Sequence, residues 1–362
     1  GMPYDAPMYV WPNEMFLADS DLSPLREDID KIVEGLTKWE PEIKETGIYP
    51  AAMLTYEGKD YEEAVTNLNA GFYKDLMTDG FPIVPPTRER VEWMLRGTDL
   101  PRDTVVGIIP NRGGIATVEV IAINAVMAGC RPEYMPVILA AVEALLDPEF
   151  GWSGMQATTN PATPLLIING PIRHELDINY KEGIFGPGFQ ANATIGRAIR
   201  LIATNVGGAF PGITTMSTHG QPGRYTAVIG ENEERLPEGW DPLNVEQGFP
   251  AGSNTVTVFP MQDITKAGYG GLPAMAGAMR KNTQGPYCSS DAQVLCIFSP
   301  DDAAWVVQGI HIEREVMTID VPPHTTKAEM QQYLFEHSRL PFEEALGGYN
   351  IESKLNRDKV KP

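Results

Sequence analysis

Cysteine is scarce in this chain, with three residues among 362: Cys130, Cys288 and Cys296. So small and odd a number argues against a disulfide-stabilised scaffold and favours a reducing compartment, so we expect a cytoplasmic protein. The five histidines are scattered, and neither an H-x-x-x-H nor a C-x-x-C pair occurs. Because structural zinc sites use such pairs, we expect no metal centre. No cofactor is evident from the sequence either.

Long apolar runs and an excess of basic charge are also missing. No stretch of about 18 apolar residues occurs, so we expect no membrane span and no membrane partner. The first residues lack the basic and apolar regions of a secretory signal. Lys and Arg number 28 against 48 Asp and Glu, a net charge of −20. Because such a chain repels phosphate groups, nucleic acid is a poor candidate partner, and a small-molecule substrate is the expected one.

Glycine and proline are abundant, at 35 and 31 residues spread over the chain. They predict many short elements joined by shaped loops. Apolar segments predict strands, whereas buried or amphipathic periodicity predicts helices. The fold class predicted is therefore α/β, with mixed sheets and buried helices. Strands are expected over 104–109, 164–169, 225–229, 255–259 and 293–298, and helices over 23–39, 61–76, 88–95, 117–128, 132–146, 193–206, 300–308 and 326–337.

Three regions are expected along the chain. Residues 1–75 form an N-terminal arm with helices, residues 76–345 form an α/β catalytic region, and residues 346–362 form a polar tail. Because a long arm can wrap around a neighbouring chain, a homo-oligomer is expected.

The helices at 117–128 and 193–206 are both entered from a glycine-bearing loop and ended by glycine. This similarity indicates two pseudo-symmetric halves, 76–180 and 181–345, facing one cleft. Chance similarity between two buried helices explains it about as well.

The sequence context of Cys130 predicts a reactive thiol. Gly129 ends one predicted helix, and Arg131 and Pro132 begin the next. A helix N-terminus and a neighbouring cation both favour thiolate, which lowers the pKa. The alternative is a small buried core residue. Cys296 lies in an apolar segment and is expected to be structural, and Cys288 lies in a loop.

Acid–base candidates follow later in the chain. His219 lies in a loop rich in hydroxyl groups and glycine, and it is the best-placed general acid or base. Glu231 and Glu233 follow the predicted strand at 225–229, where α/β sheets build sites, although such a charge run also suits a solvated turn. Glu119 begins a predicted helix, where a carboxylate also compensates the helix dipole.

Asn192, Arg197 and Arg200 follow a glycine-rich loop, residues 183–188. Backbone N–H groups at a helix start and arginine side chains bind carboxylates well, which predicts an anion cradle with Asn192 as the helix cap. The alternative is an ordinary connection with arginines in surface ion pairs. Asn124 and Asn205 lie in predicted buried helices, and a buried amide needs hydrogen-bond partners.

Several segments resemble one prokaryotic family. They are Asp79–Thr87, Met127-Ala-Gly-Cys-Arg-Pro-Glu-Tyr134, Gln156-Ala-Thr-Thr159, Asn192–Arg197 and Thr218-His-Gly-Gln-Pro-Gly223. The resemblance spans about residues 75–345. Members of this family are described as thiol-disulfide isomerase-like, or as similar to selenoprotein B of the glycine, sarcosine and betaine reductases. Some resemble fusions with a small domain carrying a U-G-S-C motif. The resemblance implies redox chemistry at a thiol and a small redox partner subunit, although this chain has no such tetrad.

The leading hypothesis is a cysteine-dependent enzyme, using thiol redox or nucleophilic chemistry on a small carboxylated molecule. Cys130 is its thiolate, His219 its proton shuttle, and Glu231 and Glu119 are further catalytic candidates. One alternative makes Cys130 structural and gives lyase or hydrolase chemistry to His219 and Glu231. Another is a noncatalytic subunit of a reductase-like complex. The substrate-binding candidates are Asn111, Arg112, Asn124, Tyr134, Thr158, Asn192 and Arg197.

Overall fold

The computed structural model describes residues 20–40, 53–266, 272, 275–279, 294–314, 317–321, 323, 326–339 and 349–350. The chain divides into two units. The first comprises Gly1–Gly230 with Asn254–Gln262, and the second comprises Glu231–Ser253 with Asp263–Pro362. Cys288 and residues 351–362 of the expected tail lie outside the described residues.

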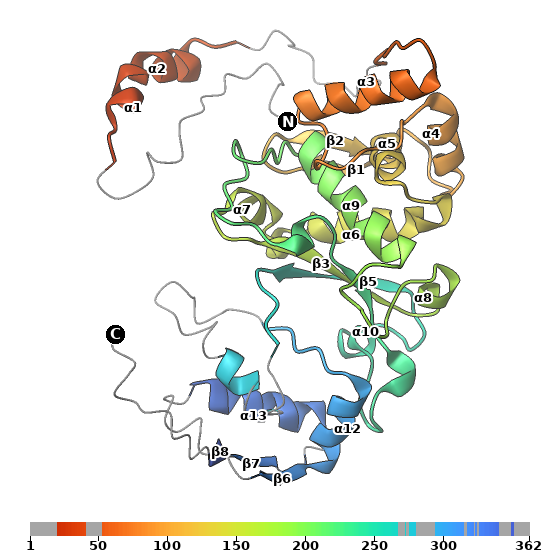
Figure 1. The fold of residues 1–362 in the computed structure, drawn as a ribbon, viewed down its shortest axis with the longest axis vertical. Helices are drawn as coiled ribbons and strands as arrows, with labels where there is room; N and C mark the ends of the chain where they lie inside the picture. The colour runs from red at the N-terminus through yellow and green to blue at the C-terminus, as the bar shows by residue number, and fades with distance from the viewer. Residues whose placement is uncertain are drawn as a thin grey trace. The chain divides into compact units, whose positions relative to one another are not determined.

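Helices and short strands alternate in the first unit (Figure 1). Its α-helices are α1 (Ser23–Glu27), α2 (Ile29–Thr37), α3 (Tyr61–Lys74), α4 (Arg88–Leu95), α5 (Val118–Ala128), α6 (Met135–Leu145), α7 (Trp152–Ala157), α8 (Ile172–Glu175) and α9 (Gln190–Asn205). Its 3-10 helices are η2 (Pro132–Tyr134), η3 (Pro148–Phe150) and η4 (Pro222–Arg224). Its strands are β1 (Val105–Ile109), β2 (Gly114–Thr117), β3 (Thr163–Asn169), β4 (Val228–Gly230) and β5 (Thr255–Met261).

Strand β3 is the centre of a three-stranded sheet of mixed orientation. It pairs in parallel with β4 and antiparallel with β5. Four consecutive apolar residues of β3, Leu165 to Ile168, are buried, as expected of a strand covered on both faces. Helix α6 packs against β5 and helix α9 against β4, on one side of the sheet (Figure 1). The predicted α/β class with mixed sheets is therefore confirmed.

The two helices of similar pattern, α5 and α9, pack directly against each other. Both carry buried apolar side chains, Ile121 and Ala125 on α5 and Ile195 and Ile202 on α9. Strands from both sides of residue 180 share the sheet of β3, β4 and β5. The packed helices and this shared sheet form one hydrophobic core, which supports the candidate site.

The N-terminal helix differs from the prediction. One continuous helix was expected over 23–39, but α1 ends and α2 begins at Asp28. Two large apolar residues of its predicted stripe, Ile29 and Leu36, are 55% and 82% exposed. The periodicity therefore predicted the helical conformation correctly, but the side chains of this stripe are not buried in the described structure.

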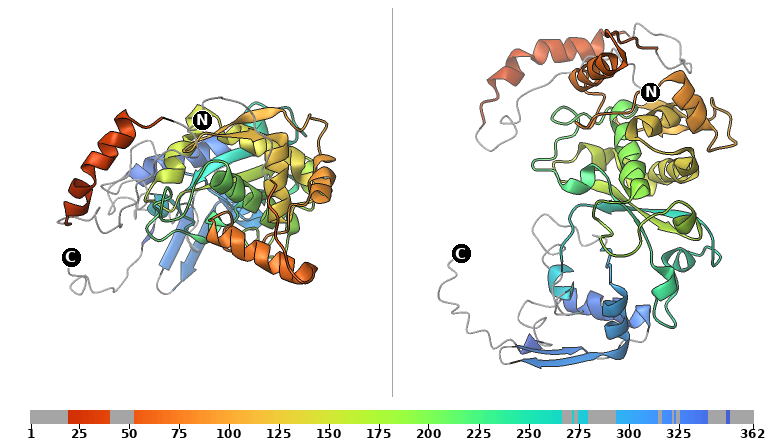
Figure 2. Two further views of the ribbon diagram at one scale, coloured as in Figure 1. Left: turned by 90° about the horizontal axis from the view of Figure 1, so that it is seen from above. Right: turned by 45° about the vertical axis from the view of Figure 1, so that its right-hand side comes forward.

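The second unit has its own small core. Trp240, Leu272, Val306, Met330 and Leu334 are buried together, and β6 and β7 pair as a ribbon to one side of α12 and α13 (Figure 2). Residues 294–298 form no strand, so the strand expected at 293–298 is wrong for the described residues. The elements of this unit are η5 (Glu233–Arg235), α10 (Leu243–Glu246), α12 (Pro300–Gln308), β6 (Ile310–Arg314), β7 (Met317–Val321), α13 (Lys327–Arg339) and β8 (Tyr349–Asn350).

Candidate functional site: an arginine-lined cavity

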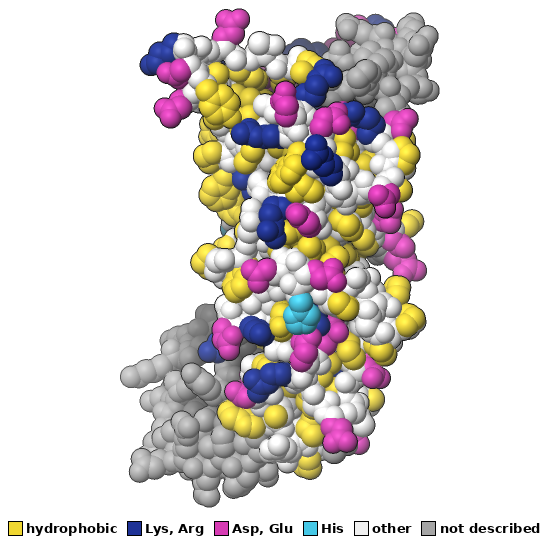
Figure 3. Space-filling model, turned by 90° about the vertical axis from the view of Figure 1, so that its right-hand side faces the viewer, with side chains coloured by type: hydrophobic (Ala, Val, Ile, Leu, Met, Phe, Trp, Pro, Cys, Tyr) yellow, Lys and Arg dark blue, Asp and Glu magenta, His cyan; other side chains and the backbone are white. Residues whose placement is uncertain are grey.

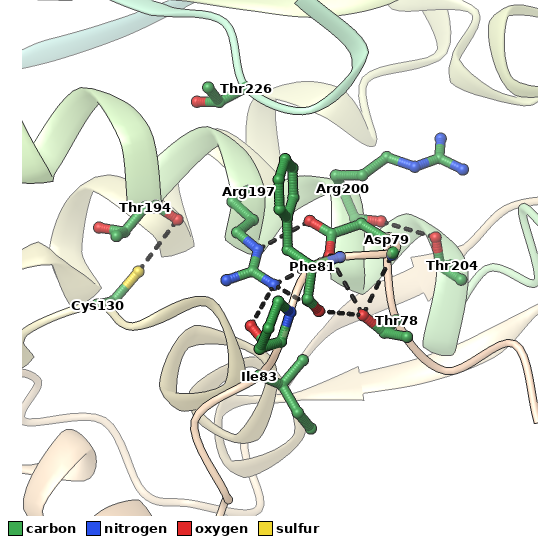
Figure 4. Close-up of polar contacts among 12 residues, drawn as sticks. Thr78, Asp79, Phe81, Ile83, Cys130, Thr194, Arg197, Arg200, Thr204 and Thr226 are labelled. Carbon is green, nitrogen blue, oxygen red and sulfur yellow. Dashed lines mark hydrogen bonds and ion pairs between the residues drawn. The ribbon is translucent and has the colours of Figure 1, made fainter. Parts of the chain in front are cut away.

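Helix α9 places two arginines one turn apart, and the first of them, Arg197, is bound to a carboxylate. Its Nε donates to Oδ2 of Asp79 at 2.8 Å and its Nη2 to Oδ1 at 2.9 Å (Figure 4). The Asp79 side chain is only 1% exposed. The same Nη2 also donates to the carbonyls of Phe81 and Pro82. Arg197 therefore holds the segment 79–82 against α9, and its guanidinium is already occupied by protein groups.

Arg200 has no such partner. Its Nη2 donates to the carbonyl of Ala209 at 2.7 Å, and it forms no salt bridge with any described residue. Burial, followed by the positive charge of Arg224, lowers the pKa of Arg200 from 12.5 to about 10, although Asp79 acts in the opposite direction. In Figure 4, Arg200 and Cys130 extend to opposite sides of the Arg197–Asp79 pair. The structure thus holds a desolvated cation on α9.

Arg224 lies at the end of η4 and faces the same region. Its Nη1 donates to the carbonyl of Ala162 at 3.2 Å. Burial lowers the pKa of Arg224, and within the described chain it also lacks a salt bridge. The positive charge of Arg224 also disfavours the charged form of Arg200. Unpaired charges in a partly buried site are costly, so such an arrangement points to a missing anion.

Arg200 and Arg224 line a cavity of about 30 Å³. A buried water molecule needs about 10–15 Å³ of such space, so the cavity admits a small molecule and excludes a large one. The walls come from α7, the start of β3, α9 and the segment around Arg224. The lining residues are Trp152, Met155, Gln156, Ala162, Thr163, Pro164, Leu166, Gly196, Ile199, Arg200, Ala203, Gly223, Arg224 and Ala227.

Gln156 supplies a third polar group to this cavity. The residue is 5% exposed, and neither its Nε2 nor its Oε1 has a hydrogen-bond partner among the described residues. A buried amide left without partners is destabilising by about 1–3 kcal/mol for each unpaired group. The cavity therefore combines two arginine cations with one unpaired donor and one unpaired acceptor.

Hydrogen bonds between two distant segments assemble these walls. The Thr215 hydroxyl donates to the carbonyl of Gln156 at 2.8 Å. The backbone N–H of Thr218 donates to the carbonyl of Thr159 at 3.0 Å. Gln221 donates its Nε2 to the carbonyl of Pro161 at 2.9 Å. The loop that carries His219 thus positions Arg224 beside α7.

Gly196 permits α9 to approach the strand side of the cavity. A Cβ atom at this position would collide with the hydroxyl of Thr226 and lie 2.9 Å from the backbone nitrogen of Ala227. That hydroxyl donates to the carbonyl of Asn192 on α9 at 2.6 Å. The glycine is thus required for the close packing that brings Arg200 over β3 and β4.

Cys130 does not have the environment predicted for it. The residue is 4% exposed, and its Sγ donates to the carbonyl of Thr194 at 3.2 Å. Its backbone N–H donates to the carbonyl of Ala125, so it closes the C-terminus of α5. Burial raises the pKa of Cys130 to about 12, although the Thr194 hydrogen bond and the charge of Arg197 act in the opposite direction. The predicted thiolate is therefore wrong.

Two further expectations around Cys130 are corrected. The helix expected from 132 begins as the short η2, which is followed by α6. Arg131 does not face the thiol in any described contact, because its Nε donates to the Tyr134 hydroxyl at 3.0 Å. The nearby cation that was to stabilise a thiolate is thus engaged by Tyr134.

Asn192 is not the cap of α9, since Phe189 holds that position. Its side chain accepts the N–H of Asn179 at 2.8 Å and donates to the carbonyls of Asn179 and Val228. These bonds connect α9 to β4. The amide therefore has a structural role that accounts for its burial.

Asn124 and Asn205 pair with each other across the α5–α9 interface. The Asn205 amide donates to Oδ1 of Asn124 at 2.8 Å, while Asn124 donates to the carbonyl of Val120. The buried amide of Asn124 was expected to need a hydrogen-bond partner, and that partner is Asn205 on α9. Asn124 has no place in the lining of the arginine cavity.

The remaining candidates are distributed over the chain. Glu119, in the first turn of α5, forms an ion pair with Arg102. Asn111 accepts a hydrogen bond from Ser153, and Arg112 lies 5.6 Å from the ring centroid of Phe210. Three more candidates make local contacts outside the cavity. The Thr158 hydroxyl accepts from the N–H of Asn160, and the exposed His219 ring shares a hydrogen bond with the Thr218 hydroxyl. The Glu231 carboxylate, in the second unit, accepts from the backbone N–H of Leu243.

Sequence reasoning missed Gln156 and Arg224 as site residues. Gln156 appears only in a segment of the family resemblance, and Arg224 follows a Pro-Gly turn with no recognisable motif. Both are brought to Arg200 by long-range contacts. No local pattern in the sequence could have assigned them to one site.

Charged side chains of both signs are interspersed on the face seen in Figure 3. The chain has a net charge of −20, whereas the lining of the cavity contains two arginines and no Asp or Glu. Among the described residues, no helix is both long and apolar enough to cross a membrane. That part of the chain also holds no group of three or more His, Cys, Asp and Glu side chains suited to a metal ion. Comparison of the chain with protein families, curated proteins and solved structures gives no match.

Proposed function

We propose that this protein binds the carboxylate group of a small organic acid between Arg200 and Arg224. The observation that carries the proposal is a buried guanidinium group and a half-buried one that line the same cavity, with no carboxylate of the described chain in its lining. Guanidinium groups match the planar geometry of a carboxylate and bind it through two parallel hydrogen bonds. An anion would offset the burial and the repulsion by Arg224 that together lower the pKa of Arg200.

The lining of the cavity favours recognition over chemistry. Apart from the two arginines, its residues are apolar or neutral, so the lining supplies no group for proton transfer near neutral pH. Cys130 is buried as a thiol and is not part of the lining. The proposed function is therefore binding of an acid, with a volume that limits the ligand to an acid group and a few further atoms.

Calorimetric titration with acetate, propionate and lactate tests this proposal. Arg200→Met and Arg224→Met keep the apolar stem and remove the charge, and Arg88→Met makes the same change at an exposed position of α4. Because a hydrogen bond to a charged group contributes about 1.5–3 kcal/mol, each cavity variant should weaken binding at least about tenfold. Arg88→Met should bind as the wild type does. Failure of the wild type to bind any of these acids, or equal binding by the cavity variants, would overturn the proposal.

A further inference from the structure

Gln156 has hydrogen-bonding requirements that a simple carboxylate does not satisfy. Whichever way its amide is turned, it presents one acceptor oxygen and one NH2 donor, and both are buried without a partner among the described residues. A carboxylate can accept from the NH2 group. It has no hydrogen to give to the amide oxygen.

The other polar groups of the cavity do not supply that hydrogen. The guanidinium of Arg200 donates to Ala209, that of Arg224 to Ala162, and the Thr163 hydroxyl donates to the carbonyl of Gly223 at 3.4 Å. The Gln156 oxygen has no hydrogen bond from any of them. An occupant of the cavity that carries a hydrogen-bond donor would satisfy this oxygen.

We infer that the acid bound here carries a hydroxyl group on the carbon next to its carboxylate, so that the ligand is a short 2-hydroxy acid. This inference rests on the proposed function. A hydroxyl group both donates and accepts, so it can satisfy the oxygen and the NH2 group of Gln156 together. The small volume places the hydroxyl close to the carboxylate held by Arg200 and Arg224.

The same chemistry disfavours the related acids. A 2-oxo acid has no hydrogen to donate, and an unsubstituted acid leaves the amide oxygen of Gln156 unpaired. A 2-amino acid can donate, but its ammonium group would lie beside two cations and be repelled. Trp152, Met155, Leu166 and Ile199 form the apolar part of the lining, which accommodates a short hydrocarbon substituent.

A titration with four acids of similar size tests the inference: lactate, propionate, pyruvate and alanine. The wild type should bind lactate at least about tenfold more tightly than the other three, because each of these leaves a buried polar group unpaired or introduces repulsion. Gln156→Met keeps the length of the side chain and removes both polar groups. In this variant lactate and propionate should bind alike, with propionate as tight as in the wild type or tighter.

Equal binding of lactate and propionate by the wild type would overturn the inference, and this comparison requires no variant. Persistence of the lactate preference in folded Gln156→Met would overturn it as well. Either result leaves the proposed function standing, provided that Arg200→Met still weakens acid binding. Absence of binding by all four acids would instead refute the proposed function and the inference with it.

Discussion

Replacement of Arg200 by methionine tests whether this arginine serves ligand binding or stabilises the fold. Lowering the pKa of this group from 12.5 to about 10 corresponds to about 3.5 kcal/mol of unfavourable burial and repulsion, at about 1.4 kcal/mol for each pKa unit. The variant removes this cost. It also removes the hydrogen bond to the Ala209 carbonyl, which contributes about 2 kcal/mol as a charged hydrogen bond.

The balance of these two contributions predicts that Arg200→Met is more stable than the wild type by about 1.5 kcal/mol in the absence of ligand. Urea unfolding at pH 7, in a buffer free of carboxylate and phosphate, measures this difference, with Arg88→Met as the control. An arginine that stabilises the fold would behave in the opposite way. A loss of more than about 1 kcal/mol in Arg200→Met would therefore refute the reasoning.

Addition of a binding acid should reverse the order of stability. At a ligand concentration of about 100 times the dissociation constant, the wild type gains about 2.7 kcal/mol. Arg200→Met should gain little, because its affinity is lower. Equal gains in the two proteins would show that the acid acts elsewhere on the chain.

Three further predictions concern the rest of the described structure. The pKa of Cys130 is raised from 9.0 to about 12, so the thiol loses its proton at a lower pH in the unfolded chain than in the folded one. The contribution of this group to stability therefore falls by about 1.4 kcal/mol per pH unit between pH 9 and about pH 12. Cys130→Ala should lack this fall in urea midpoints measured against pH, and equal slopes would contradict the assignment. Asp79→Asn leaves the Arg197 guanidinium without its carboxylate and should lower the free energy of unfolding by about 3 kcal/mol; a midpoint equal to that of the exposed control Asp99→Asn would contradict this. If the chain is a homo-oligomer held by its arm, removal of residues 1–52 should lower the number of subunits, obtained by light scattering as the measured mass divided by the mass of the shortened chain. An unchanged number of subunits would count against that role.

Local rules predicted the elements of this chain better than its site. Gly129 ends α5 as expected, with a φ of 87°, and Thr87 caps α4, because a cap depends on a few adjacent residues. The strand expected at 225–229 shortens to Val228–Gly230, since pairing with β3 decides its extent. Elements whose ends depend on tertiary pairing were thus less predictable than those with local caps.

The environment of Cys130 shows why the site was not predictable from the sequence. Its neighbours Gly129, Arg131 and Pro132 suggested a helix start, but packing against Thr194 on α9 buries the thiol. Desolvation then outweighs the charge of Arg197. Burial is a property of the assembled core, and the sequence around one residue does not contain it.

The cavity was also not predictable from the sequence, because long-range contacts decide which residues line it. Arg200 was expected to contribute to an anion site together with Arg197, and the structure separates the two. Arg197 is neutralised by Asp79, from a segment more than 100 positions away, whereas Arg200 meets Arg224 and Gln156. The predicted preference for a carboxylated molecule stays a prediction, now based on different residues.

Anomalous diffraction from crystals soaked in bromide tests the central claim most directly, because bromide is an anion that can be located without ambiguity. We predict a bromide ion between the guanidinium groups of Arg200 and Arg224, displaced when lactate is added to the crystals. Bromide bound only at other positions, with the space between these two arginines unoccupied by any anion, would contradict the account.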